Sequence, residues 1–278
     1  MSLQWYPGHM TKARRELEAL MPSQDVVIEV LDARMPAASS NPVLTELRRD
    51  KPAIKVLTKS DLADPAATKA WIEHFEAQPN VSAFASTTER PQDTKKRIAA
   101  LTRNSALHRG RDKAVRALIA GVPNVGKSTL INTLVDRQVA KVSDKPAVTK
   151  EQQTVVLGNG TVLTDTPGIM WPKIEDEQGA FRLAFAGSIP DTAIDYLQIA
   201  AFGARILLDR YAPLVVARYK LPATPPTPEA LLTEIGRRRA GLGSGGTVDL
   251  HKAATILINE FRAGTIGRIT LELPRAPR

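Results

Sequence analysis

The chain has 278 residues, 43% of them hydrophobic and 24% charged, which is enough for one large domain or two smaller ones and excludes a disordered chain. It has no cysteine, no signal-peptide segment and no apolar run near the roughly 18 residues that cross a bilayer, which excludes disulfides, thiolate zinc sites and thiol catalysis and favours a cytoplasmic protein. The formal net charge of +9 favours an anionic partner, with nucleic acid as the first candidate, although a basic surface can also serve solubility alone.

The first part of the chain alternates predicted strands with predicted helices. After an opening segment with Trp5, Tyr6 and a Pro-Gly pair, a helix is predicted from Thr11, which is a suitable cap. Strands are predicted at residues 25–31, 53–57 and 81–85. We expect a loop at 36–42, helices at 42–49, 65–76 and 92–106, and a basic connector at 103–116.

A further strand at 114–120 is followed by a helix at 129–135 and a hairpin at 153–163. Beyond Pro172 helical patterns dominate, at 193–211, 228–240 and 249–262, with one weak strand at 268–273. This order predicts an α/β fold, a mostly parallel sheet with helices on both faces, followed by a smaller, mainly helical region. The predicted domains are residues 1–172 and a basic domain at 173–278.

Residues 121–128 match G-x-x-x-x-G-K-[ST], the phosphate-binding loop of NTPases. In such a loop backbone amides and the N-terminus of the next helix attract phosphate. Lys127 is predicted to reach the β- and γ-phosphates, and the Ser128 hydroxyl to bind magnesium. A chance glycine-rich turn is the rival interpretation, but it does not explain the flanking strand and helix. The predicted phosphate contacts are Asn124, Val125, Gly126, Lys127, Ser128 and Thr129.

Downstream, Asp165-Thr166-Pro167-Gly168 follows a strand and matches D-x-x-G, the second half of such a site. Asp165 is predicted to hold magnesium, and the Gly168 amide to bind the γ-phosphate. Thr149, in an irregular segment between the two motifs, is predicted to add a magnesium ligand. An ordinary surface threonine is the alternative for that position.

Thr58-Lys59-Ser60-Asp61 ends a predicted strand, where ligands bind in open α/β sheets. The Asp61 carboxylate can accept hydrogen bonds from the ring N–H and the amine of guanine, whereas adenine has no amine on that edge. Lys59 is predicted to lie over the base, and Ser86, at the end of the next strand, to offer an amide to the guanine carbonyl. The alternatives are that Asp61 caps a helix and that Ser86 belongs to an ordinary turn.

These motifs resemble those of Ras-type GTPases, with Thr58–Asp61 in place of N-K-x-D and Ser86 in the S-A motif. The base-reading motifs precede the phosphate loop, which is typical of circularly permuted GTPases. Residues 5–10 and 249–272 resemble the YlqF/RbgA group of ribosome-biogenesis GTPases. The resemblance covers nearly the whole chain. It implies GTP hydrolysis in late assembly of the large (50S) ribosomal subunit, and a helical C-terminal domain that contacts rRNA.

Three positions depart from that pattern. Thr58 replaces the usual asparagine, so we expect a lost side-chain contact to the base and to the phosphate loop, and Ala147 replaces a common glycine. Ile169 stands where Ras-like enzymes carry a water-orienting glutamine, so the catalytic group must come from elsewhere. His9 is the candidate, because histidine can orient or deprotonate water and the family is thought to use it. The alternative is a histidine packed against Trp5.

Two ligands beyond GTP and magnesium are implied. Asn124 resembles the asparagine of potassium-activated GTPases, which makes potassium a candidate activator. Basic residues of the C-terminal region are candidates for contacts with rRNA phosphates, and any of them can instead be a solvated helix residue. A different class of function, a nucleotide-dependent regulatory switch acting on a protein partner, stays open, and an ATPase is disfavoured by Asp61. The candidates for rRNA contacts are Arg237, Arg238, Arg239, Lys252, Arg262 and Arg268.

Overall fold

The structure is a computed structural model that describes residues 7–107, 114–135, 153–166, 176–240 and 247–274. Residues from Asp176 to Leu271 form a helical unit, and the described residues before and after them form a sheet unit. The segment from Glu272 onward was predicted to belong with the helices, and it groups with the sheet unit instead. We describe the two units separately.

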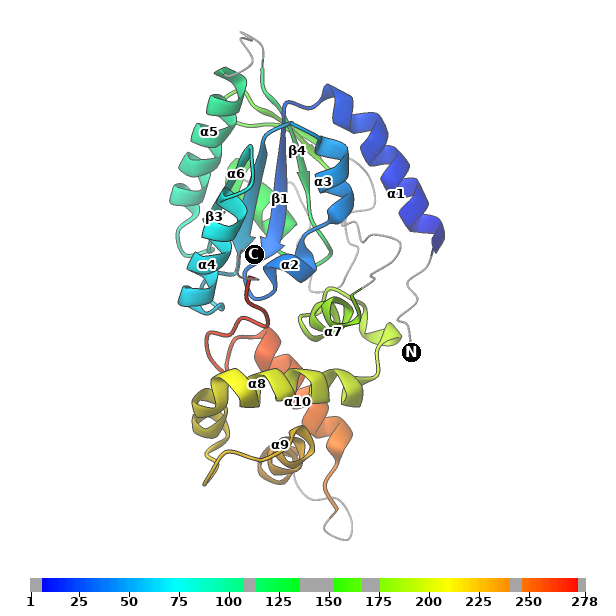
Figure 1. Ribbon diagram of the computed structural model, residues 1–278, viewed down its shortest axis with the longest axis vertical. Helices are drawn as coiled ribbons and strands as arrows, with labels where there is room; N and C mark the ends of the chain where they lie inside the picture. The colour runs from blue at the N-terminus through cyan, green and yellow to red at the C-terminus, as the bar shows by residue number, and fades with distance from the viewer. Residues whose placement is uncertain (1–6, 108–113, 136–152, 167–175, 241–246, 275–278) are drawn as a thin grey trace. The chain divides into compact units, whose positions relative to one another are not determined.

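The sheet unit is built on six strands in the order β3-β2-β1-β4-β6-β5 (Figure 1). All neighbouring pairs are parallel except β5 and β6, which form the predicted antiparallel hairpin. The carboxyl ends of the parallel strands therefore meet at one edge, where ligands bind in such folds. The strands are β1 (Val26–Asp32), β2 (Ala53–Thr58), β3 (Val81–Ala85), β4 (Arg116–Ala120), β5 (Gln153–Val156) and β6 (Val162–Asp165).

Helices cover both faces of this sheet, as predicted for an α/β fold. Val27 packs with α1 (Pro7–Leu20) and α3 (Pro42–Arg48), and Leu31, on the same side of β1, packs with α4 (Pro65–Glu76). Phe84 of β3 points to the opposite face, where Arg97 of α5 (Pro91–Leu107) lies 5.3 Å from its ring. There α5 contacts α6 (Lys127–Val135).

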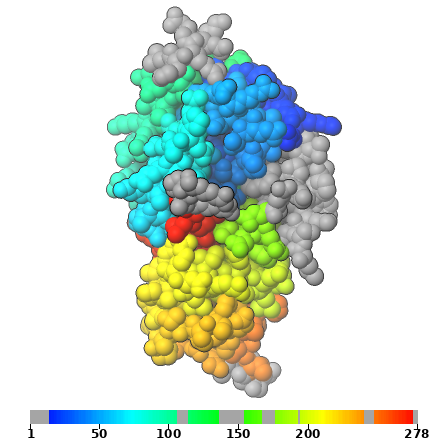
Figure 2. All heavy atoms as spheres, in the orientation of Figure 1, coloured from blue at the N-terminus to red at the C-terminus, as the bar shows by residue number. Residues whose placement is uncertain are grey.

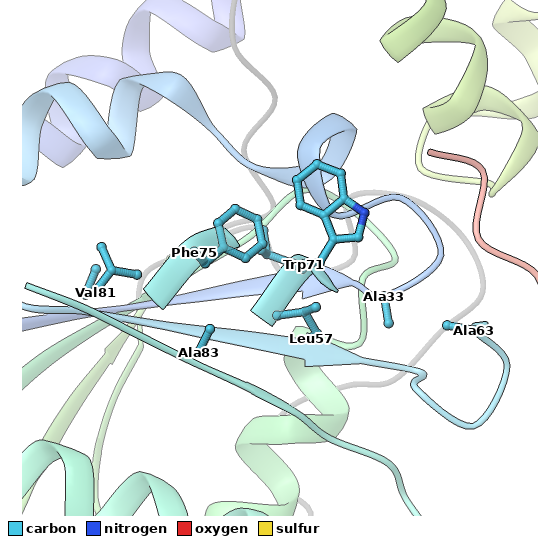
Figure 3. Packing of buried hydrophobic residues seen from close by; sticks show 9 residues of the cluster. Ala33, Leu57, Ala63, Trp71, Phe75, Val81 and Ala83 are labelled. Carbon is cyan, nitrogen blue, oxygen red and sulfur yellow. The ribbon is translucent and has the colours of Figure 1, made fainter. Parts of the chain in front are cut away.

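An aromatic cluster fixes α4 on the sheet. Trp71 and Phe75 project from α4 onto Leu57, Val81 and Ala83 of the strands beneath (Figure 3). Both rings are almost completely buried, and their centroids lie 5.4 Å apart. The cluster includes Leu57 near the end of β2, and therefore supports the backbone that leads into the predicted base-reading motif.

A buried ion pair lies in the middle of the sheet. Glu29 of β1 and Lys55 of β2 are register neighbours, and the Lys55 ammonium donates to the Glu29 carboxylate. The other carboxylate oxygen accepts the Asn41 amide at 2.7 Å and the Ser40 hydroxyl at 3.1 Å. Buried charges persist when they are paired and hydrogen-bonded in this way. The pair thus joins the neighbouring strands β1 and β2 to the start of α3.

The helical unit consists of α7 (Glu177–Phe185), α8 (Tyr196–Tyr219), α9 (Pro228–Ile235) and α10 (Leu250–Arg262). Side-chain oxygens of Asp176, Asp195, Thr227 and Asp249 cap the four N-termini. Phe185 of α7 stacks on Phe261 of α10 with centroids 4.4 Å apart. A Cβ at Gly203 of α8 would lie 2.3 Å from the Phe185 ring, so only glycine permits this approach.

Several elements differ from their prediction. The first helix begins at Pro7, which suits a first helical turn, and not at Thr11. The predicted loop at 36–42 contains a short helix, α2 (Pro36–Ser39), and α7 was not predicted. The polar contacts that hold α2 involve residues far away in the sequence, so local sequence patterns do not reveal this helix. The predicted weak strand at 268–273 is wrong, because no strand is assigned there.

The C-terminal segment is held by hydrogen bonds within the sheet unit. The indole nitrogen of Trp71 donates to the Glu272 carbonyl at 3.1 Å. The Glu272 carboxylate accepts the Ala38 amide of α2 at 2.9 Å. In Figure 2 the red spheres of this segment lie against the cyan spheres of α4. Within the described residues, no helix has both the length and the apolar character that crossing a membrane requires.

Candidate nucleotide site

The phosphate loop connects β4 to α6 at the carboxyl edge of the sheet. Two of its glycines are required by geometry. A Cβ at Gly121 would lie 2.7 Å from the Val30 carbonyl oxygen, and Gly126 has a φ of 94°, which side-chain-bearing residues rarely adopt. Lys127 is the first residue of α6, and Ser128 and Thr129 follow in its first turn. The amides there face the loop, as an anion site at a helix N-terminus requires.

Lys127 and Asp165 come together in the buried centre of the site. The Lys127 ammonium donates to Oδ1 of Asp165. Burial lowers the pKa of Lys127, while burial raises the pKa of Asp165, and their mutual attraction opposes both shifts. The predicted phosphate-binding lysine and the predicted magnesium-binding carboxylate are thus neighbours.

The residues present fit a magnesium ion. Oδ2 of Asp165 is buried and has no hydrogen-bond partner among the described residues. A buried carboxylate oxygen without a partner is costly, and a hard cation or its bound water prefers such a ligand. Ser128, one residue after Lys127, is the second predicted ligand, and Thr149 lies outside the described residues.

Thr58 bridges β2 to the phosphate loop. Its hydroxyl lies within hydrogen-bonding distance of the Leu31 carbonyl, at 2.8 Å, and of the Val125 carbonyl in the loop. The expectation that threonine at this position loses the contact to the phosphate loop is therefore wrong. The threonine side chain is shorter than that of asparagine, but β2 and the phosphate loop are close enough for its Oγ1 to span them.

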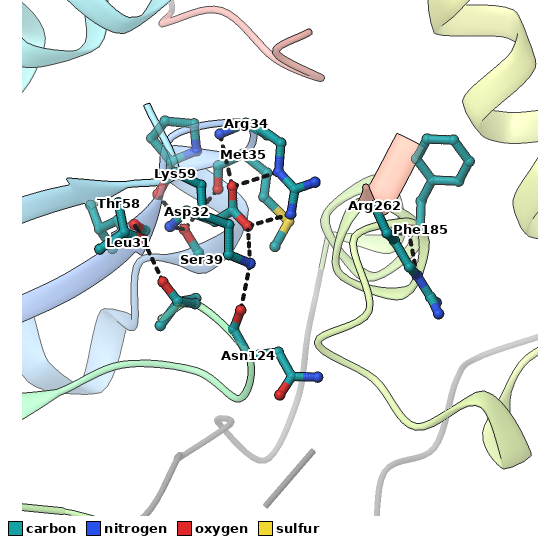
Figure 4. Close-up of polar contacts among 12 residues, drawn as sticks. Leu31, Asp32, Arg34, Met35, Ser39, Thr58, Lys59, Asn124, Phe185 and Arg262 are labelled. Carbon is teal, nitrogen blue, oxygen red and sulfur yellow. Dashed lines mark hydrogen bonds and ion pairs between the residues drawn. The ribbon is translucent and has the colours of Figure 1, made fainter. Parts of the chain in front are cut away.

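Lys59 makes a second bridge to the same loop. Its ammonium donates to the Asn124 carbonyl at 2.6 Å and to Oδ2 of Asp32 at 2.9 Å (Figure 4). Both Lys59 and Asn124 have left-handed backbones, with φ of 55° and 61°. Non-glycine residues adopt this region at a cost that surrounding contacts must offset. The base-reading motif and the phosphate loop are consequently one connected structure.

Asp32 and Arg34 were not among the predicted site residues. Asp32 ends β1, is fully buried, and accepts hydrogen bonds from the Arg34 guanidinium as well as from Lys59. Burial alone would raise the pKa of Asp32, but the charges of Arg34 and Lys59 outweigh it and hold the pKa well below its usual range. A signal existed in the sequence, because Asp32 directly follows an apolar strand, as Asp165 does.

The backbone of Ser86 corrects one predicted role. Its amide donates to the Leu57 carbonyl at 2.8 Å, as part of the β2–β3 ladder, so it is not available for a guanine carbonyl. The Ser86 carbonyl instead accepts the amide of Ser60 at 3.2 Å and its hydroxyl at 3.0 Å. Ser86 therefore positions the loop that carries Asp61.

Asp61 is half-buried in the loop after β2. The alternative that it caps α4 is excluded, because Asp64 is the cap and accepts the amides of Ala66 and Ala67. No described contact joins Asp61 to the phosphate loop directly. Its place at the carboxyl edge of the sheet follows from the loop that Lys59 and Ser60 anchor.

Three further predicted site residues are not tested by these contacts. Gly168 and Thr149 lie outside the described residues, and so do Ala147 and Ile169. His9 falls in the first turns of α1, but its side chain is outside the description. The described residues therefore include the predicted base-reading motif and the phosphate loop, and not the side chains predicted to act in catalysis.

The candidate rRNA contacts of the helical unit differ in their availability. Arg262 donates to the carbonyl of Phe185 (Figure 4) and to that of Ala184, at the end of α7, and pairs with Asp191 at 3.0 Å. This arginine is structural, which corrects its predicted role. The side chains of Arg237 and Arg238 are 60% and 37% exposed, and both pair with Glu234, one helical turn away. Such exposed pairs are weak, so these guanidinium groups can exchange to phosphate.

Comparison with known proteins agrees with this geometry. A family model described as 50S ribosome-binding GTPase matches residues 116–198. Ribosome biogenesis GTPase A of Bacillus pumilus is 41% identical over 99% of this chain and 100% of that protein. Its namesake in Thermotoga maritima is 32% identical over 98% and 95%. GDP-bound YlqF matches with a TM-score of 0.68 and 28% identity over 94% of this chain and 99% of that one. The family match begins at β4, so β2, which ends at Thr58, and β3, which Ser86 follows, both precede it, in the permuted order.

Proposed function

The chain belongs to the ribosome biogenesis GTPase A (YlqF/RbgA) family, a group of circularly permuted GTPases, and from that premise we propose that the site described above is where it binds and hydrolyses GTP. The observation that carries this proposal is the double bridge from β2 to the phosphate loop, by Thr58 to Val125 and by Lys59 to Asn124. It supports a single pocket in which Asp61 reads guanine while residues 124–129 and Gly168 hold the phosphates.

Magnesium, when bound, would neutralise phosphate charge and fix the γ-phosphate for attack. Asp165, Ser128 and Thr149 are the residues proposed to hold it. With magnesium bound, the Asp165 carboxylate would have the doubly charged ion as its partner. Lys127 would then leave Asp165 and bind the β- and γ-phosphates. The ion pair of Lys127 and Asp165 keeps both buried charges compensated.

We propose that hydrolysis is slow until a large (50S) ribosomal subunit precursor brings His9, Thr149 and Gly168 into their catalytic arrangement. In the sequence, the segment after Asp165 leads directly into the helical unit. We therefore expect loss of the γ-phosphate to change how the helical unit binds its partner. The predicted division near residue 172 stays part of this proposal. We propose a cytoplasmic location on the basis of this role in ribosome assembly.

Binding to the subunit precursor is the test of this function. Full-length protein is expected to co-sediment with large-subunit particles in the presence of a non-hydrolysable GTP analogue, and much less with GDP. Because the proposed contacts are to rRNA phosphates, binding is expected to weaken steeply with salt. Replacing Arg237 and Arg238 by alanine is expected to lower affinity and the steepness of the salt dependence together.

The matched control is Arg262→Lys, which alters an arginine that the helical unit uses internally. It is expected to lower thermal stability and to leave the salt dependence unchanged. Co-sedimentation that ignores the bound nucleotide, or that is absent, would favour the alternative, a nucleotide-dependent switch acting on a protein partner.

We also propose that a potassium ion beside Asn124 supplies positive charge during hydrolysis. The left-handed backbone of Asn124 and its carbonyl contact to Lys59 hold this residue in a fixed place at the phosphate loop. Potassium is expected to raise the hydrolysis rate above that in sodium at equal ionic strength. Asn124→Ala should remove the difference while GDP binding persists, whereas equal rates in the two salts would end this proposal.

A further inference from the structure

Asp32 makes an unusual set of contacts for a residue that terminates a strand. Its Oδ1 accepts the Arg34 amide at 3.0 Å and the Arg34 Nε at 2.9 Å. Its Oδ2 accepts Nη2 of Arg34 at 2.8 Å and the Lys59 ammonium at 2.9 Å. Both oxygens are used, and the planar guanidinium fixes the plane of the carboxylate. The Asp32 carboxylate therefore has one orientation.

That orientation aims Oδ2 at the base-reading motif. Arg34 is two residues away along the chain, so its pairing with Asp32 is local. Lys59 is 27 residues away, and its contact is the long-range one. The Lys59 side chain is 26% exposed while Asp32 is fully buried, so the carboxylate approaches the pocket from its protein side.

Lys59 transmits this contact to the phosphate loop. The ammonium that Asp32 holds also donates to the Asn124 carbonyl at 2.6 Å (Figure 4). Asp32, Lys59 and Asn124 thus form a continuous polar chain from the end of β1, across the end of β2, to the loop. The last two have left-handed backbones, so the chain joins the two strained points of the site.

We propose that Asp32 is a positioning residue for nucleotide binding. Oriented by Arg34, it holds the Lys59 ammonium against the Asn124 carbonyl and so keeps the base-reading motif and the phosphate loop at the spacing that one guanine nucleotide spans. The role rests on the proposed function of this pocket. Asp32 touches no nucleotide in this account and acts only through Lys59. Without the charge of Asp32, Lys59 would keep its contact to Asn124 for a smaller fraction of the time.

The test is GDP and GTP affinity of full-length Asp32→Asn, measured by titration with a fluorescent guanine nucleotide. Asparagine keeps one acceptor oxygen and the size of the side chain but removes the charge. Affinity is expected to fall about tenfold for both nucleotides, mainly through faster dissociation, because coupling of this size is typical between linked sites. Arg34→Lys keeps the charge and loses the planar fork, and is expected to show a smaller loss.

Glu29→Gln is the matched control, because it breaks an equally buried ion pair on the same strand that does not contact the phosphate loop. It is expected to lower the melting temperature and to leave GDP affinity unchanged at temperatures where the protein is folded. An equal loss of affinity in Glu29→Gln would overturn the proposal, since general loosening of the sheet would then explain both variants.

The route through Lys59 is tested by a double-mutant cycle. In a Lys59→Met background, Asp32→Asn is expected to cause no further loss of affinity, whereas additive losses would contradict the proposed route. If Asp32→Asn does not fold, Arg34→Lys takes its place in the same cycle. Failure of the wild-type protein to bind GDP would count against the proposed function itself, while normal binding by Asp32→Asn would count against this inference alone.

Discussion

Replacing Asp61 by asparagine is expected to move the preference of the pocket from guanine to xanthine nucleotides. A carboxylate accepts from both the ring N–H and the exocyclic amine of guanine. Asparagine still accepts from the ring N–H but points an amide donor at the guanine amine, and the two donors repel. Xanthine carries a carbonyl at that position, which accepts from the amide. Loss of such matched hydrogen bonds costs on the order of 10³-fold or more in affinity.

The expected loss is large because Thr58 leaves Asp61 as the main reader of the base. The single proton of the Thr58 hydroxyl is shared between the carbonyls of Leu31 and Val125, and a threonine side chain has no amide to offer the base. Titration of wild-type and variant protein with GDP and with xanthosine diphosphate measures the change. The melting temperature serves as control, since Asp61 is half-buried and caps no helix. Unchanged GDP affinity would show that another residue reads the base.

Much of the sheet unit could be predicted because its signals are local. The strands are short apolar runs, the hairpin has a glycine at its turn, and the phosphate loop is a fixed sequence pattern. The helix at residues 65–76 was predicted with its observed bounds, since a cap and a proline mark its start. These features depend on neighbours along the chain, which is the information a single sequence contains.

The elements that were missed depend on distant residues. The short helix α2 is held by Glu272, far away in sequence, and the same residue, which falls within the predicted strand, accepts a hydrogen bond from Trp71. The hydrophobic periodicity of the sequence indicates neither contact. The same holds for Arg262, whose position in a helix gave no sign that it caps the end of α7. Tertiary structure decides these cases.

The site divides in the same way. Lys127 and Asp165 were predicted to line one nucleotide pocket because each belongs to a recognisable motif, and the structure brings them together as an ion pair. Asp32 was missed because a lone aspartate after a strand matches no motif. The role of the Ser86 amide was misassigned because it depends on whether the β2–β3 ladder includes that residue, which sequence alone does not determine.

Replacing His9 by alanine is expected to reduce subunit-stimulated GTP hydrolysis by about 10²- to 10⁴-fold, the usual contribution of a general acid–base residue. The reason is the position after Gly168, where Ile169 cannot hydrogen-bond the attacking water. His9 is not among the residues that bind the base or the phosphates. GTP and GDP affinities are therefore expected to stay at wild-type values, and a change there would point to altered packing of the N-terminal segment.

A glutamine at position 9 separates the two ways in which the histidine can act. Glutamine can orient a water molecule by hydrogen bonding but cannot accept its proton near neutral pH. Partial activity of His9→Gln, with a flat pH dependence across the range where histidine titrates, would show that orientation is the main contribution. Activity as low as that of His9→Ala would show that proton transfer matters. Wild-type rates in both variants, measured as phosphate release with saturating large subunits, would remove His9 from the catalytic site and direct attention to groups supplied by the ribosomal particle.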